Sequence, residues 1–414
     1  MNSASAPSPA APLTPPASAA SSSATVLPII FAVSAGHLLN DTIQSLLPAL
    51  YPILKDELSI NFAQVGLITL AFQLTASILQ PLVGIFTDRH PQPYSLPTAM
   101  VFTLCGVVLL AFANTFPLVL VAAAFIGFGS SIFHPEASRV ARLASGGKYG
   151  LAQSIFQVGG NTGSALGPLL ASVIIAHRSQ SHAAWFALVP LIGFFVLMRA
   201  SAWYSEKLAH MKRNPAAHRT AAAPLTRGRT IFAIAILGIL IFSKFFYMAC
   251  LGSYYTFYLI DTFHVSVDHA QLYLFLFLAA CAVGTFIGGP VGDRIGRKTV
   301  IWVSILGVAP FALLLPHANL LWCAVLSVVI GVILSSAFSA ILVYAQELVP
   351  SRVGLISGLF FGFAFGMGGI GSAVLGYLAD QTSITYVFHV CAWLPLIGLL
   401  TAFLPDTHPK RAHR

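Results

Sequence analysis

The stretch Gly289-Pro-Val-Gly-Asp293-Arg294-Ile-Gly296-Arg297-Lys298 lies between two long apolar runs and decides the fold. Its glycines permit sharp turns and close helix approach, and its aspartate can accept hydrogen bonds from helix N-termini or from arginine. A weaker copy, Gly84-Ile-Phe-Thr-Asp88-Arg89, begins at residue 84 instead of 289, an offset of 205. The same offset carries Ser130-Ser131-Ile-Phe133 onto Ser335-Ser336-Ala-Phe338. Two motifs repeated at one offset indicate an internal duplication, in which half of the chain forms one bundle.

The composition places the chain in a lipid bilayer. Hydrophobic residues make up 57% of it and charged residues 8%, whereas about a quarter of the residues of a soluble domain are charged. The net charge of +9 would suit nucleic acid, but the basic residues are spread over short loops, which is typical of membrane topology and predicts no nucleic-acid partner. The cysteines lie singly in apolar runs without metal or disulfide spacing and are predicted to be core residues: Cys105, Cys250, Cys281, Cys323 and Cys391.

Apolar runs predict an all-α membrane protein with twelve transmembrane helices in two pseudo-symmetric six-helix bundles, because most runs reach the ~20 residues that span a bilayer. They cover residues 26–54, 62–86, 95–116, 117–142, 150–176, 183–204, 231–260, 268–291, 299–316, 319–347, 353–380 and 385–404. The predicted parts are a disordered tail (1–25), a first bundle (26–204), a basic cytoplasmic linker (205–230), a second bundle (231–405) and a cytoplasmic tail (406–414).

The distribution of basic residues predicts the orientation. With the N-terminus inside, only Lys55 and Arg178 of the 21 lysines and arginines fall outside, and Lys244 lies within a helix. Both termini are therefore predicted to be cytoplasmic.

Four polar residues share one face of the first predicted helix, because Ser34, His37, Asp41 and Gln44 recur at spacings of three and four. Asp41 lies about fifteen residues into this helix, near the middle of the bilayer. A carboxylate at that depth costs several kcal/mol and is usually retained for function. Asp41 and His37 are therefore predicted to couple transport to protons; the alternative is a carboxylate held by a neighbouring helix.

The fourth predicted helix carries a second polar group, His134-Pro135-Glu136 followed by Arg139 and Arg142. Pro135 is expected to interrupt the helical ladder and free backbone groups to line a cavity. Glu136 and Arg139 are three residues apart and can pair. We predict Glu136 as a further proton-coupling residue, and His134 and Arg139 as substrate ligands, whereas Arg142 is expected to reach the membrane surface.

Lys244 is the one basic residue at mid-depth in the second half. An unpaired ammonium is costly there, so it must meet a carboxylate, a water-filled cavity or an anionic ligand. We predict that it binds substrate, the alternative being a fixed Lys–Asp pair. Tyr247 and Tyr254 on its face are further candidates for the substrate site, together with His37 and the fifth-helix amides Gln157 and Asn161.

Small residues and loop charges are predicted to serve packing and gating. The packing residues are Gly163, Gly167, Pro168, Gly358, Gly362 and Gly366. The residues expected to hold the cytoplasmic side closed are Gly84, Asp88, Arg89, Gly289, Asp293, Arg294, Gly296, Arg297 and Lys298. Gln346 and Glu347 are placed at the cytoplasmic surface, with Glu347 pairing an arginine of the central loops.

The paired loops and the two six-helix halves resemble the major facilitator superfamily. Four further motifs resemble the family of fosmidomycin resistance proteins of Gram-negative bacteria: His37-Leu-Leu-Asn-Asp41, Ser131-Ile-Phe-His-Pro-Glu136, Ser154-Ile-Phe-Gln-Val-Gly-Gly-Asn161 and Tyr344-Ala-Gln-Glu347. The resemblance covers residues 26–405. It implies a monomeric, proton-driven antiporter that exports the phosphonate antibiotic fosmidomycin across the bacterial inner membrane without a cofactor.

The chain departs from the superfamily pattern at two places, and its features disfavour three other classes of membrane protein. Pro91-Gln92-Pro93 stands where the superfamily has Gly-Arg-Lys, which predicts a weaker first gate. The step Gly163-x-x-x-Gly167-Pro168 resembles the antiporter motif of the superfamily, but Ala171-Ser172 replaces its usual closing glycines, so this motif alone does not settle the direction of transport. An enzyme would need a metal or nucleophile cluster, a channel has no need of duplicated gating loops, and a receptor normally carries a soluble domain. Transport is favoured, with proton-coupled uptake of a small organic anion as the alternative.

Overall fold

Helices dominate the computed structural model, which describes residues 24–174, 179–213 and 225–405 and has no strand in these ranges. The first half contains α1 (Leu27–Ala49), α2 (Tyr51–Glu57), α3 (Phe62–Gln73), the π-helical turn η1 (Leu74–Ile78), α4 (Leu79–Arg89), α5 (Ser95–Phe112), α6 (Phe116–Ala144), α7 (Tyr149–Ile174), the 3-10 helix η2 (Gln180–Ala187) and α8 (Leu188–Arg213). The second half contains α9 (Arg227–Phe263), α10 (Val267–Ile295), α11 (Arg297–Ile305), η4 (Leu306–Val308), α12 (Ala309–Leu314), η5 (Leu315–His317), α13 (Leu320–Ser335), α14 (Ala337–Leu348), η6 (Pro350–Arg352), α15 (Val353–Gln381), α16 (Ile384–Cys391) and η7 (Leu394–Phe403). Each predicted span coincides with one helix or with consecutive shorter ones, so the predicted fold class is confirmed.

Local chemistry explains several helix boundaries. Asn61 and Gln64 form a capping box that starts α3, and Gly296, at φ 98°, makes the turn from α10 to α11. The expected interruption at Pro135 is not found, since α6 continues through it. A proline removes a single N–H, which a long, packed helix can tolerate. Among the cysteines, Cys105 is exposed and the other four are buried as predicted.

Most of the predicted tails lies outside the described residues, as do residues 214–224 of the predicted linker. Helix α8 continues to Arg213 and α9 begins at Arg227, so helical structure reaches into both ends of that linker.

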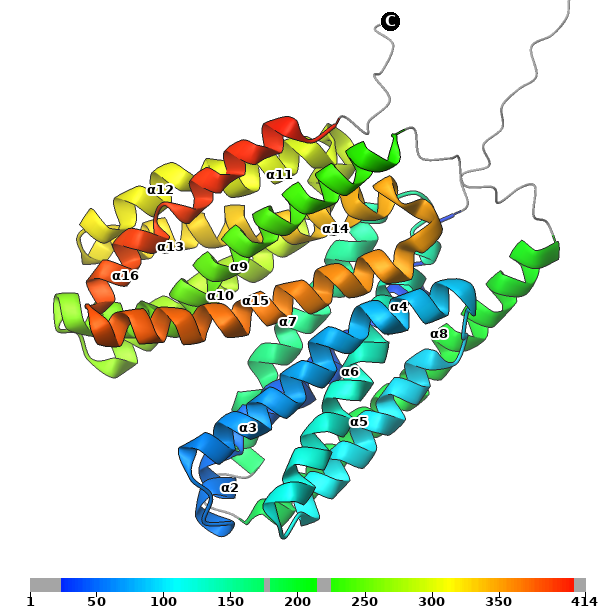
Figure 1. Cartoon of the computed structure of the whole chain (residues 1–414), viewed down its shortest axis with the longest axis horizontal. Helices are drawn as coiled ribbons and strands as arrows, with labels where there is room; N and C mark the ends of the chain where they lie inside the picture. The colour runs from blue at the N-terminus through cyan, green and yellow to red at the C-terminus, as the bar shows by residue number, and fades with distance from the viewer. Residues whose placement is uncertain (1–23, 175–178, 214–224, 406–414) are drawn as a thin grey trace, which may run out of the picture.

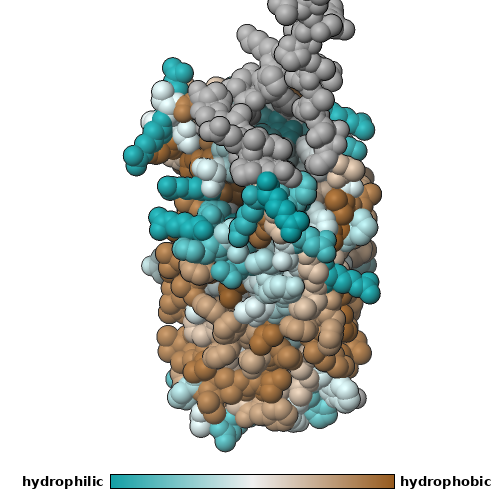
Figure 2. Space-filling view, turned by 90° about the vertical axis from the view of Figure 1, so that its right-hand side faces the viewer, coloured by the Kyte–Doolittle hydropathy of each residue, from teal (hydrophilic) through white to brown (hydrophobic). Residues whose placement is uncertain are grey.

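The surface matches a lipid environment. Ten helical segments of the described chain are long and apolar enough to cross a membrane. Helices α1 and α7 are not among these ten, in agreement with their polar residues. Large apolar side chains such as Leu82, Phe195, Phe275 and Leu321 are exposed. Figure 2 shows hydrophilic side chains gathered in the upper part of one face above a mainly hydrophobic surface.

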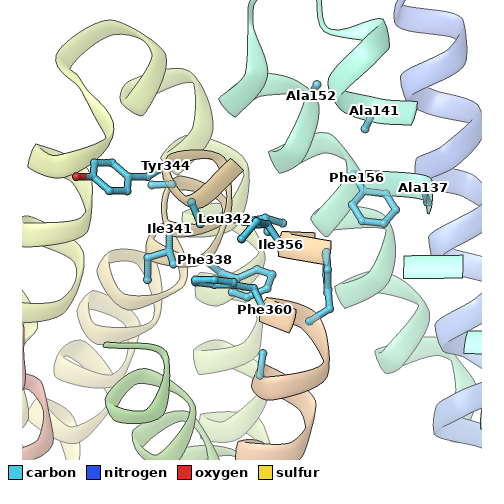
Figure 3. Close-up of a cluster of buried hydrophobic side chains, with 14 of the residues drawn as sticks. Ala137, Ala141, Ala152, Phe156, Phe338, Ile341, Leu342, Tyr344, Ile356 and Phe360 are labelled. Atoms are coloured by element: carbon cyan, nitrogen blue, oxygen red, sulfur yellow. The ribbon is translucent and has the colours of Figure 1, made fainter. Parts of the chain in front are cut away.

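Among the described residues, one hydrophobic core cluster joins the two halves, at one end of the molecule. Figure 1 shows the two bundles side by side, and α4 packs against α15 while α7 packs against α10. One core cluster contains residues of both halves, including Phe156 of α7 and Phe338, Ile356 and Phe360 of α14 and α15 (Figure 3). Two other clusters each belong to a single half. We call the end with the shared cluster, where α4 and α10 terminate, the latch end, and the opposite end the far end.

Candidate functional site

At the latch end, Asp88 of the first half binds the start of α15 in the second. Its Oδ1 accepts a hydrogen bond from the Gly354 N–H at 2.9 Å and its Oδ2 from the Leu355 N–H at 2.8 Å. A helix N-terminus favours an anion because its first N–H groups lack partners inside the helix. Arg139 also donates to Asp88 Oδ1, at 2.5 Å. Asp88 therefore links two elements across the halves.

Asp293 of the second half makes the equivalent contacts with the first. Its Oδ1 and Oδ2 accept hydrogen bonds from the N–H groups of Gly150 and Leu151 at the start of α7, both at 2.9 Å. Arg297 donates to Asp293 Oδ1 at 2.7 Å and lies 3.3 Å from Glu347 Oε1. The prediction that Glu347 pairs with a loop arginine is thus confirmed. Each half holds a helix start of the other through one aspartate.

Glycines let these helices approach each other closely. A Cβ added at Gly84 would overlap the backbone of Gly354, and one added at Gly289 would overlap the backbone of Gly150. Arg89 and Arg294, which the sequence assigned to the gate, are exposed and make no ion pair within the described ranges. The arginines that contact the two aspartates are Arg139 and Arg297, and Lys298 donates to Ala402 O at 3.4 Å.

Hydrogen bonds centred on Gln346 join both halves near the two aspartate contacts, and the sequence did not predict them. Gln346 Nε2 donates to Ser138 Oγ at 3.0 Å and to Ser357 Oγ at 2.9 Å, and Ser138 donates to Gln153 Oε1 at 3.1 Å. Arg142 donates to Gln346 Oε1 at 3.3 Å. Gln346 is buried, in contrast to the expected surface position, because α14, which carries it, packs against the first half at this point. No periodicity marks it, since its partners come from other helices.

A histidine–aspartate–histidine cluster lies between α1 and α6. His37 Nε2 is 3.3 Å from Asp41 Oδ2, and His134 Nε2 is 3.4 Å from Asp41 Oδ1. All three side chains are buried. Asp41 Oδ1 also accepts hydrogen bonds from Asn40 Nδ2 at 3.0 Å and Gln44 Nε2 at 2.7 Å. The face predicted in the first helix therefore exists, and His134, expected to bind substrate, joins it.

Aromatic rings connect this cluster to the second half. The Phe156 ring stacks on His37 with centroids 4.1 Å apart, and Phe361 of α15 lies 5.2 Å from His134. Phe361 also packs on Phe338, centroids 5.2 Å apart. The cluster is thus covered on the side of the second half by rings that belong to the shared core.

Lys244 lies beyond the same rings. It is 5% exposed and forms no ion pair with any residue that the structure describes. Its Nζ sits 5.2 Å from the Phe245 ring centroid and 5.4 Å from that of Phe338. The alternative of a fixed Lys–Asp pair therefore finds no partner among the described carboxylates. A buried ammonium next to aromatic rings, with no carboxylate partner among the described residues, is suited to bind an anion.

Glu136 is separate from the cluster and belongs to the latch end. Its Oε1 is 3.1 Å from Arg139 Nη1, and its Oε2 accepts a hydrogen bond from Ser95 Oγ at 3.3 Å. Arg139 in turn contacts Asp88. A carboxylate tied to the latch can respond to opening of the halves, but it shares no described contact with Asp41.

The remaining predicted ligands differ in their surroundings. Tyr247 is buried with a hydroxyl that has no hydrogen-bond partner, whereas Tyr254 donates to Ser372 O at 2.5 Å. Gln157 is half-buried with a free Oε1. Asn161 is exposed and donates to Thr285 Oγ1 across the halves at 3.2 Å.

Four of the six predicted packing residues lie against another helix. Gly163 and Gly167 lie against α1, and Gly358 and Gly362 lie against Gln80 and Ser77 of the first half. Gly366 faces open space, with no atom within 4 Å of an added Cβ. Pro168 is exposed inside a continuous α7.

A cavity of about 680 Å³ opens between α4, α5 and α6. Mostly apolar side chains line it, among them Leu82, Phe86 and Phe128, together with Ser95. It contains none of the predicted substrate ligands.

Comparison with known proteins agrees with this arrangement. The sequence profile of the Major Facilitator Superfamily matches residues 33–260 and 237–414. The chain is 62% identical to the fosmidomycin resistance protein of Escherichia coli K12 over 382 residues, covering 92% of this chain and 94% of that protein. It is 42% identical to the uncharacterized MFS-type transporter YfnC of Bacillus subtilis 168, covering 94% of this chain and 95% of that one. The human organic anion transporter MFSD10 has a similar fold, with a TM-score of 0.72 at 17% identity, over 92% of this chain and all of that one.

Proposed function

Since this chain belongs to the Major Facilitator Superfamily, and within it to the fosmidomycin resistance protein family, we propose that it exports fosmidomycin in exchange for protons. The superfamily is one of transporters, which agrees with the prediction that the chain is not an enzyme. Export across the bacterial inner membrane would use the proton gradient alone, with no cofactor, in a monomer. The observation that carries the proposal is the 62% identity to a protein named for this resistance, together with a buried cation suited to a phosphonate.

The described conformation supports alternating access. With both termini in the cytoplasm, as the basic residues predict, the latch end is the cytoplasmic end. Asp88, Asp293 and the shared core then close the cytoplasmic side, while the far ends of the halves have separate cores. This is the arrangement of an outward-open carrier, and breaking the two aspartate contacts would begin the change to inward-open.

Lys244 is proposed as the anion-binding group. It is buried next to Phe338, a ring of the core cluster that the two halves share, and has no acidic partner among the described residues. Tyr247 and Gln157 offer polar atoms without partners, and Asn161 adds an amide at the boundary. Arg139 is less suitable than the sequence suggested, because Asp88 and Glu136 occupy its guanidinium.

Asp41 is proposed as the centre of the proton site, with His37 tuning it. Both are buried and adjacent, and rings from α7 and α15 cover His37 and its cluster partner His134. Movement of α15 would therefore change access of protons to the site. Phe361 contacts His134 and Phe338, and Phe338 contacts Lys244. A shift of these rings would therefore affect both the proton site of the first half and the anion site of the second, so that the two sites can be occupied in turn.

Fosmidomycin-induced pH change in proteoliposomes tests the proposal. Wild type is expected to move protons in the direction opposite to the drug. Asp41→Asn is expected to lose export driven by a pH difference and to keep part of its counterflow of radiolabelled drug. Full active transport by Asp41→Asn would move the proton site to Glu136. Net drug uptake along with protons by wild type would favour the alternative, an uptake transporter for a small organic anion.

A further inference from the structure

Hydrogen bonds in the His37–Asp41–His134 cluster fix where its imidazoles can hold protons. His37 Nδ1 lies 2.8 Å from Phe156 O, and His134 Nδ1 lies 3.0 Å from Ser130 O. A carbonyl oxygen only accepts hydrogen bonds, so His37 Nδ1 donates to Phe156 O. His134 Nδ1 also lies 3.2 Å from Ser130 Oγ, and in the tautomer that satisfies Ser130 O it carries the hydrogen as well. In the neutral imidazole the lone pair then lies on Nε2.

Both of these Nε2 atoms face the Asp41 carboxylate. One lies 3.3 Å from Oδ2 and the other 3.4 Å from Oδ1, and neither has a hydrogen-bond partner. A lone pair facing a carboxylate oxygen in a buried site is unfavourable. One proton between each nitrogen and its oxygen turns both contacts into charge-assisted hydrogen bonds. The geometry thus offers two equivalent proton positions around one aspartate.

The Asp41 carboxylate also accepts hydrogen bonds from neighbouring amides. Oδ1 of Asp41 accepts hydrogen bonds from the amides of Asn40 and Gln44. Phe156 of α7 and Phe361 of α15 face the cluster, and neither side chain titrates. Among the described residues, Asp41 is therefore the one carboxylate that contacts the two histidines.

We propose that the cluster binds two exchangeable protons, one on Nε2 of each histidine, with Asp41 as their shared counter-ion. This inference rests on the proposed function, because these are the protons exchanged for substrate. It makes His134 a proton carrier instead of a substrate ligand. Each proton enters on a bare Nε2 to form an imidazolium and leaves from it again, so two protons move inward for each substrate molecule exported.

The ratio of drug concentrations across the membrane at steady state reports how many protons are exchanged for each drug molecule. In proteoliposomes with the membrane potential held at zero, each coupled proton contributes about tenfold to that gradient per pH unit. At a pH difference of about one unit, we expect His134→Gln to reach a gradient about tenfold smaller than wild type, because the amide can donate to Asp41 but cannot take up a proton. The matched control is His389→Gln, since His389 Nδ1 also meets the carbonyl four residues earlier, Thr385 O at 2.8 Å, outside the cluster. It should reach the wild-type gradient.

The outcomes separate this inference from the proposed function. Equal gradients in wild type and His134→Gln, with proton exchange in both, would overturn the two-proton site and leave proton-coupled export standing. Absence of proton movement in wild type would overturn the proposed function itself. If His134→Gln does not transport, nitrogen-15 spectra of histidine-labelled wild type decide. At a pH low enough to load the site, two imidazolium signals that shift in Asp41→Asn are expected. A lone-pair Nε2 signal that either cluster histidine retains at that pH would contradict the proposal.

Discussion

Lys244 is the side chain on which drug recognition is expected to depend. Its buried charge has no acidic partner among the described residues and would be satisfied by a phosphonate. We expect Lys244→Gln to weaken fosmidomycin binding about 10- to 100-fold, because a hydrogen bond to a charged group contributes about 1.5–3 kcal/mol. Lys244→Arg should also bind poorly, since the planar guanidinium fork needs a different partner geometry. Equilibrium binding to detergent-purified protein over a pH series measures both.

Lys212→Gln, which removes an exposed cation of α8, is the control for loss of a lysine. It should bind as wild type does. Equal affinities of wild type and Lys244→Gln across the series would assign Lys244 to structure and not to the substrate.

Charged residues such as Lys244 could be identified as candidates from the sequence because a charge is unexpected inside an apolar, membrane-spanning run. Asp41 and Lys244 interrupt apolar runs, and His37 shares a face with Asp41 at a spacing of four. The contact of His134 with Asp41, on which its proposed role depends, could not be read in this way, because the two residues lie 93 positions apart, at 134 and 41. Gln346 was misplaced for the same reason: only the closed halves bring Ser138 and Ser357 to it.

At the scale of elements, two aspartate-to-helix contacts are expected to hold the latch end closed. Asp293→Asn removes the charge that faces the first N–H groups of α7, and such charges at helix starts are worth up to about 2 kcal/mol. We expect labelling of Ser154→Cys by a maleimide added at the latch end to become about tenfold faster, because Ser154 is buried against α10, where it accepts from the Gly289 N–H. Asp88→Asn should act in the same direction.

Ser154→Cys without a second substitution is the reference for both variants. Unchanged labelling in Asp88→Asn and in Asp293→Asn would rule out the latch.

Close approach of α10 and α7 gives a second prediction at this scale. In Gly289→Ala the new methyl would overlap the Gly150 backbone, so the closed arrangement should be destabilised by about 1–3 kcal/mol, as in other overpacked sites. Export of fosmidomycin should fall about tenfold. Gly366→Ala is the matched helix control, because its methyl would meet no atom within 4 Å. Equal export by both variants would show that this contact is dispensable.

The sequence predicted the helices, and it predicted the two loops as gates, but not their partners. Apolar length and the repeated glycine–aspartate motif are local signals. Arg89 and Arg294 stand next to the aspartates in sequence, yet Arg139 and Arg297 contact them in space. A helix start as the partner of Asp88 or Asp293 becomes visible only when the halves are packed together.

For the whole molecule, the hydrophobic cores of the described residues meet at the latch end and stay separate at the far end, which supports the proposed outward-open state. The duplication explains this arrangement, because each half presents the same aspartate to a helix start of the other. Two equivalent contacts can then break together when the halves rock.

The charge balance of the whole cycle gives the last prediction. An anion leaving the cell and protons entering it both move positive charge inward, so an inside-negative potential should drive export. Each charge is worth about 2.3 kcal/mol per 100 mV, which corresponds to about 50-fold in the drug gradient. With a potassium diffusion potential imposed by valinomycin, wild-type proteoliposomes should respond to both voltage and pH difference. Asp41→Asn should keep the voltage response that the anion contributes and lose the pH response, because its proton site is gone while Lys244 is intact. A wild-type gradient that does not change with voltage would contradict inward charge movement and, with it, the assignment of the drug as the transported anion.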